Sequence, residues 1–168
     1  MALILCLASV GCGTGTSNLV TALNAVSDAA NVSVVVTSSL VALGKIDQAT
    51  ADQVSQYATG VGGAVNTSIA ELNSADPNPQ KITVITAAFA KVATPAFGPN
   101  SAQISATIDA VSAAIKIFLS HLNSTGTLKL AAAAPAAKIV LAPGDKAVMK
   151  AMQKKTADTL AKAAALKQ

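Results

Sequence analysis

The sequence predicts an all-α protein, an antiparallel helical bundle of four main helices followed by a C-terminal basic amphipathic helix. Apolar residues recur every three or four positions over successive segments, which is the period of an amphipathic helix. Ala supplies 37 of the 168 residues, while only 2% are aromatic and 12% are charged, against about a quarter charged in ordinary soluble domains. This length suits one domain, and 52% apolar content is enough for a sizeable core of thin, closely packed helices.

The first helix is expected over residues 18–43. Its apolar stripe comprises Leu19, Leu23, Val26, Ala30, Val34 and Val41. The β-branched run at 32–37 favours a strand instead, so a strand at this point stays open as an alternative. Gly44 is expected to end the helix in the left-handed conformation that glycine adopts readily.

The second helix is expected over residues 47–73, with Asp47 as its N-cap. Its apolar stripe comprises Val54, Tyr57, Val61, Val65, Ile69 and Leu72. Gly60, Gly62 and Gly63 interrupt the middle of this helix. We expect a kink or a close helix contact there, because a dinucleotide-binding glycine loop needs a strand before it and an acidic residue after it.

The third and fourth helices are expected over residues 79–93 and 101–122. Asn78 should cap the third, with Pro79 in the first helical position, and its stripe comprises Ile82, Ile85, Phe89 and Val92. The stripe of the fourth comprises Ile104, Ile108, Val111, Ile115, Phe118 and Leu122. We expect the four central residues of this last stripe, from Ile108 to Phe118, to be buried.

The C-terminal part of the chain carries the positive charge. Residues 129–168 hold eight of the twelve Lys and two acids, a formal charge of +6, whereas residues 13–128 have a formal charge of −2. Ala and Pro predict a linker over residues 129–143, and Asp145 should cap a basic helix over residues 144–168. We expect this tail to be a weakly held, separable appendage.

The basic helix has two unlike sides at 100° per residue. The residues expected on its cationic side, as a contact for an anionic lipid or an envelope polymer, are Lys146, Lys150, Lys154 and Lys162. The residues expected on its apolar side are Val148, Met149, Met152, Leu160 and Leu166.

The N-terminal residues have the pattern of an export signal. An apolar run at residues 2–10 is too short to span a membrane, so residues 1–11 are expected to be a signal peptide. The segment Ala8-Ser9-Val10-Gly11-Cys12 resembles the lipobox of bacterial lipoproteins, with Ser9 where Leu is usual. The resemblance implies that Cys12 is lipidated and anchors the chain to a membrane of the bacterial cell envelope, with residues 12–17 as a flexible tether.

Two alternatives to this anchor remain open. Ser9 and Gly11 are also the small residues that an ordinary secretory cleavage before Cys12 requires, and the N-terminus could stay uncleaved and buried. Cys6 lies within the expected signal peptide, so the mature chain would hold Cys12 alone. A lone Cys in an exported chain favours the lipidated form, since it is otherwise unpaired.

The residue inventory argues against an enzyme. The chain has no Arg and no Trp, Glu71 is its only Glu and His121 its only His. A nucleophilic site needs a base and an orienting group, and a metal site needs clustered ligands, so we expect no catalytic residues, no metal and no cofactor. His121 is expected to lie on the surface near a helix end. Nucleic-acid binding is not expected, because the lysines have no Arg or aromatic residues among them.

The sequence therefore favours a non-enzymatic, envelope-anchored lipoprotein that acts as a structural, adaptor or assembly component. In general appearance it is similar to small helical lipoproteins of the bacterial envelope. Its expected partners are the membrane, through the lipid, and a protein partner or a second copy. The alternative is a helical-bundle module that binds an apolar ligand or a partner helix, which predicts a cavity lined by Ile, Val and Phe.

Overall fold

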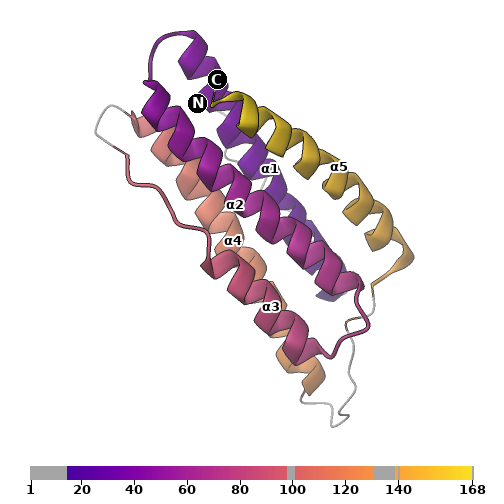
Figure 1. Cartoon of the computed structure of the whole chain (residues 1–168). Helices are drawn as coiled ribbons and strands as arrows, with labels where there is room; N and C mark the ends of the chain where they lie inside the picture. The colour runs from indigo at the N-terminus through magenta and orange to yellow at the C-terminus, as the bar shows by residue number, and fades with distance from the viewer. Residues whose placement is uncertain (1–14, 98–100, 131–138, 140, 168) are drawn as a thin grey trace.

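The computed structural model describes residues 15–97, 101–130, 139 and 141–167, and of residues 126–130 only the helical backbone. The described residues form five helices that lie side by side in one body (Figure 1): α1 (Gly15–Ala42), α2 (Gln48–Asn73), α3 (Asn78–Ala90), α4 (Ala102–Leu130) and α5 (Pro143–Ala165). No strand occurs in these ranges. The all-helical class expected from the sequence is therefore confirmed, including a helix through the β-branched run at 32–37.

Each helix buries most of the stripe that its sequence period predicts. The exceptions are half-buried residues, Val41, Ile82, Val92, Ile115 and Leu160, and Val148 of α5, which was expected on the apolar side and is 42% exposed. In α2 every predicted stripe residue, from Val54 to Leu72, is at most 3% exposed. In α4, Ile108, Val111 and Phe118 are buried as expected, and Ile115 is half-buried. In α3 the ring of Phe89 packs against that of Phe118 with 5.5 Å between ring centroids.

The helix contacts place α1 and α2 at the centre of the fold. α1 packs against α2, α4 and α5, and α2 packs against α1, α3 and α5, while α3 also contacts α4. One apolar cluster runs through all five helices and includes Met149 and Met152 of α5. A smaller cluster joins Val34, Ala58, Ala163 and Leu166 where α1, α2 and α5 meet.

The turn between α1 and α2 has the geometry that its sequence predicts. Gly44 has a φ of +61°, and the Lys45 N–H donates to the Leu40 carbonyl at 2.9 Å, which closes the end of α1 as a left-handed glycine does. Asp47 then accepts the Thr50 N–H at 2.8 Å as the N-cap of α2.

The expected cap of α3 is wrong. Pro77 is the N-cap residue and Asn78 is already the first residue of α3. The Asn78 side chain is 1% exposed, and its Oδ1 accepts the backbone N–H of Ile139 at 2.7 Å. Asn78 therefore holds a distant segment of the chain, because a buried backbone N–H needs an acceptor.

Other helix limits also differ from the expected ones. α3 ends at Ala90 and not at residue 93, and α5 ends at Ala165 and not at residue 168. α1 begins at Gly15, so residues 15–17 belong to a helix and not to the tether; Thr16 is buried and the Ser17 hydroxyl donates to Asp145 Oδ1 at 3.4 Å. α4 continues to Leu130 past the expected end at 122. Its Ser124 hydroxyl donates to the Ser120 carbonyl at 2.9 Å. Ser124, which favours a turn in the sequence, is therefore compatible with the helix.

The expectation that residues 129–168 form a weakly held appendage is wrong for α5. Its buried residues comprise Asp145, Met149, Met152, Thr156, Thr159 and Ala163. These pack against α1 and α2, so α5 is a fifth helix of the same body. Residues 129 and 130 lie in α4 and Ile139 is buried; the rest of the expected linker at 131–138, and residue 140, lie outside the described residues.

Candidate functional site

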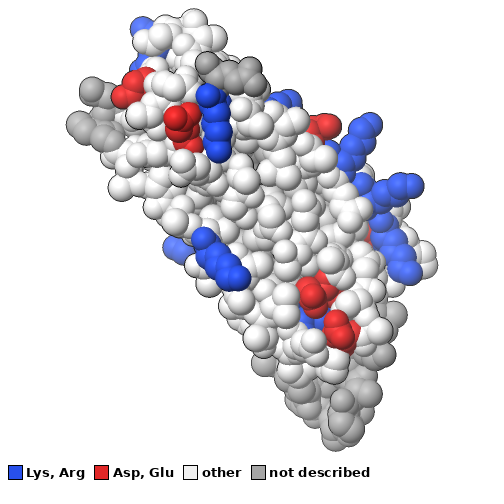
Figure 2. Space-filling model, in the orientation of Figure 1, with Lys and Arg blue, Asp and Glu red and all other residues white. Residues whose placement is uncertain are grey.

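The lysines expected to form a cationic surface lie together on the outer side of α5. Because the opposite side of the helix is buried, spacings of four and eight residues turn these side chains toward solvent, and the exposed Asp158 occupies the position between the last two. All four are exposed: Lys146, Lys150, Lys154 and Lys162. Figure 2 shows Lys side chains standing out from the edge of the molecule that α5 forms. We call these four residues the lysine row.

Asp145 fixes the start of the lysine row. Its expected place as the N-cap is wrong, because Ala142 is the N-cap residue and Asp145 is the third residue of α5, where it is 6% exposed. One carboxylate oxygen accepts the Ala142 N–H at 2.9 Å and the other accepts the Ser17 hydroxyl. Asp145 thus stabilises the first turn of α5, as an acidic residue at a helix N-terminus does, and joins that turn to the first turn of α1.

A second contact holds the middle of α5 against α1. Lys155, beside the lysine row, forms an ion pair with Asp28 and also donates to Asn24 Oδ1 at 3.3 Å. Both charged side chains are partly exposed, so the pair contributes about 0–1 kcal/mol to stability. The sequence signal for this contact is Asp28 itself, an acid within an otherwise uncharged helix, whose partner on another helix could not be identified from the sequence.

Side-chain hydrogen bonds continue along the interface of α5 with α1 and α2. Toward α1, the hydroxyls of Ser27 and Thr156 lie 3.2 Å apart, and the Lys162 ammonium donates to Asn31 Oδ1 at 3.3 Å. Toward α2, the Ser55 hydroxyl donates to the Ala163 carbonyl at 2.6 Å, and the Gln48 side-chain amide donates to the Leu166 carbonyl. These bonds run in the same order along α1 and α5 and in opposite order along α2, so α5 is parallel to α1 and antiparallel to α2.

The glycine trio of α2 serves helix packing at one position. A Cβ on Gly62 would lie 2.8 Å from Leu160 Cδ2 of α5, whereas a Cβ on Gly63 would have nothing within 4 Å. The close helix contact expected from the sequence is confirmed at Gly62. Gly60 lines a cavity of about 350 Å³ together with Tyr57 and Lys91.

The described residues contain no group of three or more His, Cys, Asp or Glu that could hold a metal ion. His121 is half-buried within α4, nine residues before Leu130. Its expected place near a helix end is wrong because α4 is longer than its sequence suggested.

Tyr57 of α2 is 3% exposed, and its hydroxyl oxygen lies 3.2 Å from that of Ser112 in α4. Burial raises the pKa of the Tyr57 hydroxyl, while the hydrogen bond with Ser112 lowers it. This pair links α2 to α4.

Two helices are long and apolar enough to cross a membrane by length and composition. They are Thr16–Ala42 and Ala102–Thr125, and their most apolar windows are 50% and 28% buried within the fold. Both are compatible with membrane association, and the core helix of a soluble protein meets the same criterion. Residues 1–11 and Cys12, which the sequence assigns to the export signal and the anchor, lie outside the described residues.

Comparison with known proteins adds no relative. No family model matches the chain, and neither a curated protein nor a solved structure gives a significant match.

Proposed function

We propose that the protein is a non-enzymatic lipoprotein of the bacterial cell envelope, anchored through Cys12 and acting as a structural, adaptor or assembly component. The lysine row is its contact for anionic lipid or an anionic envelope polymer. Its four main helices, α1 to α4, form an antiparallel unit against which α5 docks, and a second copy or another protein is its partner. Nucleic acid is not a partner in this proposal.

One observation carries the proposal: the cationic helix begins beside the start of α1. The Ser17 hydroxyl and the Asp145 carboxylate are 3.4 Å apart, and Lys146 follows Asp145 directly. Cys12 precedes Gly15 by three residues, a length that spans at most about 10 Å. An anchor at Cys12 would therefore keep the start of the lysine row close to the lipid surface.

The distances along α5 determine which lysines reach the membrane first. Lys150 lies about 6 Å along the helix axis from Lys146, and Lys162 about 24 Å, at 1.5 Å per residue. Charges interact effectively over about 8 Å at physiological salt. An upright body would bring Lys146 and Lys150 within that range, and each basic residue near an anionic surface contributes about 1 kcal/mol to binding.

The anchor is tested by Cys12→Ser in the native host. We expect the wild-type chain to partition into detergent with acyl chains at its mature N-terminus, and the variant to be soluble or retained as precursor, because multiple acyl chains are needed for stable attachment. The measurement is phase partition with intact mass. Unchanged partition of Cys12→Ser, or an unacylated wild-type chain that begins at Cys12, contradicts the anchor.

The lysine row is tested with two matched double variants of the full chain, Lys146→Gln/Lys150→Gln and Lys91→Gln/Lys116→Gln. All four side chains are exposed, so both doubles remove the same charge without disturbing the core. We expect only the α5 double to lose cosedimentation with vesicles containing anionic lipid, and added salt to have the same effect on the wild type. Equal losses in both doubles would mean that net charge, and not the lysine row, governs binding.

A further inference from the structure

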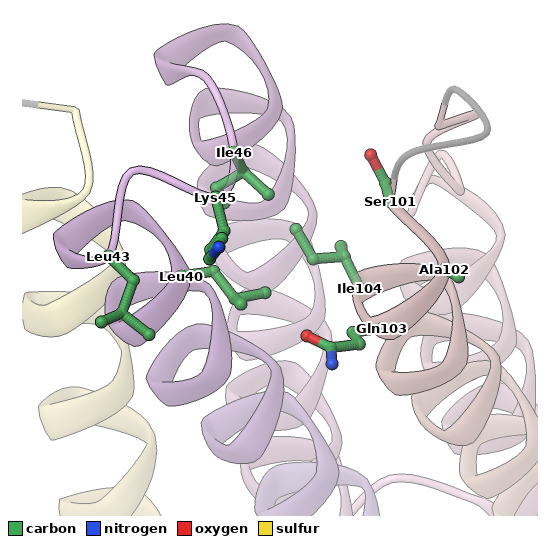
Figure 3. A pocket seen from close by; sticks show the side chains of 8 residues that line it. All are labelled: Leu40, Leu43, Lys45, Ile46, Ser101, Ala102, Gln103 and Ile104. Atoms are coloured by element: carbon green, nitrogen blue, oxygen red, sulfur yellow. The ribbon is translucent and has the colours of Figure 1, made fainter.

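A cavity opens at the end of the fold where the turn between α1 and α2 faces the start of α4 (Figure 3). Its volume is about 420 Å³, within the range of about 300–1,000 Å³ that is usual for small-molecule sites. Leu40, Ile46 and Ile104 converge in it from the two sides. Leu43 stands at its rim and is 68% exposed, more than any other large apolar side chain of the described residues.

The cavity continues into a polar part. A neighbouring cavity of about 360 Å³ shares Lys45, Ile46 and Ser101 with the first and adds Asp47 and Thr50. The two together therefore have an apolar part and a polar part that meet at Lys45. This combination suits a molecule with an alkyl chain and one polar head.

The polar part favours a negative charge. It lies between the first turn of α2 and the first turn of α4, and helix N-termini present unpaired N–H groups and a partial positive charge. The first turn of α4 contains no acidic residue that would compensate this charge. Lys45 lines both cavities and adds a full positive charge to their lining, with its nitrogen beside Leu40 in the view of Figure 3.

Ser101 also lies where the two cavities join. It is 9% exposed and lines both of them. Its hydroxyl can donate a hydrogen bond, so it is a candidate contact for the polar head of a ligand.

The Asp47 carboxylate, also in the polar part, is already engaged by α2. It accepts the Thr50 N–H at 2.8 Å. Hydrogen bonding with the Thr50 side chain, and then with this N–H, lowers the pKa of the Asp47 carboxyl group. Its negative charge is directed at the N-terminus of α2, which leaves Lys45, Ser101 and the start of α4 for another anion.

We propose that this double cavity binds a single-chain anionic amphiphile, a medium-chain carboxylate, with its head at Lys45 and Ser101 and its alkyl chain against Leu40, Leu43 and Ile104. The site lies at the opposite end of α1 from Gly15 and does not depend on the anchor or the lysine row. It makes the protein a carrier or sensor of such a molecule in addition to any structural role.

The test measures binding of decanoate below its micellar concentration to the full chain by calorimetry, with NMR amide shifts to locate it. We expect saturable binding with shifts at residues 43–47 and 101–104, no binding of acetate, which lacks the alkyl chain, and at least tenfold weaker binding of decanol, which lacks the charge. Comparable affinity for decanol, binding of acetate alone, shifts elsewhere or no saturation would each overturn the proposal.

Variants separate the two parts of the site. Lys45→Gln and Leu43→Ser change exposed side chains and should leave the melting temperature unchanged, yet each should weaken decanoate binding at least tenfold. Lys91→Gln, which removes an exposed lysine at a different cavity, should bind as the wild type does. Wild-type affinity in either cavity variant, or an equal loss in the Lys91 control, would refute the assignment.

Discussion

Phe118 is a single side chain on which α3 and α4 both depend. It is 0% exposed and its ring meets Phe89 at 5.5 Å between centroids. Removal of a buried phenyl ring loses its transfer free energy and leaves a cavity that the neighbouring helices fill only in part. The chain has three Phe and no Trp, so few other side chains of this size can compensate.

We predict that Phe118→Ala lowers the free energy of unfolding by about 3–5 kcal/mol, measured by urea denaturation. The adjacent Ile117 provides the control, since it is 44% exposed, and Ile117→Ala should change stability by no more than about 0.5 kcal/mol. Similar losses in the two variants would mean that the face of α4 that carries Ile117 is also buried, for example against a second copy.

At the residue scale, Asn78 shows that a local sequence pattern does not determine the hydrogen-bond partner of a side chain. The pair Asn78-Pro79 has the composition of a helix start, and a helix does start there. The side chain has another role because Ile139, 61 residues later, brings an unpaired N–H to it. Local spacing identified the element correctly, and only the tertiary contact determines which backbone group the amide serves.

At the scale of elements, the period of apolar residues predicted every helix and most of the buried positions. The limits of the helices were predicted less well, because groups such as Asn123-Ser124-Thr125-Gly126 favour a turn only when no tertiary contact opposes it. Thr125 is buried, and this burial favours the continuation of α4 through residues 123–126. The glycine trio of α2 was similarly ambiguous, because its meaning depends on which helix packs against it.

The two adjacent glycines of α2 permit a matched comparison. We predict that Gly63→Ala raises the free energy of unfolding by about 0.5–1 kcal/mol, because Ala is the better helix former and the new Cβ meets nothing within 4 Å. Gly62→Ala gains the same propensity but places its Cβ 2.8 Å from Leu160 Cδ2, so Leu160 or α5 must move.

Gly62→Ala should therefore be less stable than Gly63→Ala in the same thermal or urea unfolding experiment. The double variant Gly62→Ala/Leu160→Ala should recover the difference that is due to the contact, once the separate cost of Leu160→Ala is subtracted in a double-mutant cycle. Equal stability of the two alanine variants would show that α5 does not pack closely on α2.

At the scale of the whole molecule, charge gave a misleading picture of the C-terminal part. A tail of +6 beside a body of −2 suggested an appendage held only by weak electrostatic attraction. The described residues contain one ion pair between α5 and the rest of the fold, Lys155 with Asp28. Electrostatic attraction therefore contributes little to the free energy that holds α5 in place. α5 is held instead by burial of Met149, Met152 and Leu166 and by hydrogen bonds to α1 and α2, which net charge does not reveal.

The candidate sites were predictable to different degrees. The lysine row follows from spacings of four and eight residues on a single helix, so the sequence was sufficient to place its four residues on one exposed side. The cavity beside Lys45 and Ser101 joins two segments more than 50 residues apart in the sequence, and no local pattern pairs them. Such a site appears only once the packing of α1 against α4 is known.

Because burial holds α5, we predict that its removal destabilises the entire bundle. Each fully buried Met or Leu contributes about 1.5–3 kcal/mol, a large share of a typical stability of about 5–15 kcal/mol. A chain that ends at Leu130 should therefore melt well below the full chain, whereas 1 M salt, which screens Lys155 and Asp28, should not release α5. Thermal unfolding followed by circular dichroism measures both effects.

A point variant separates loss of packing from the general effect of truncation. Met152 is 0% exposed and Val148, on the same helix, is 42% exposed, so we expect Met152→Ala to cost about 2–5 kcal/mol and Val148→Ala at most about 0.5 kcal/mol. A separable appendage would give the opposite pattern, with neither variant nor the truncation affecting the unfolding of α1 to α4. Such a result would mean that α5 dissociates from α1 and α2 in solution. The start of the lysine row would then no longer be fixed beside the start of α1.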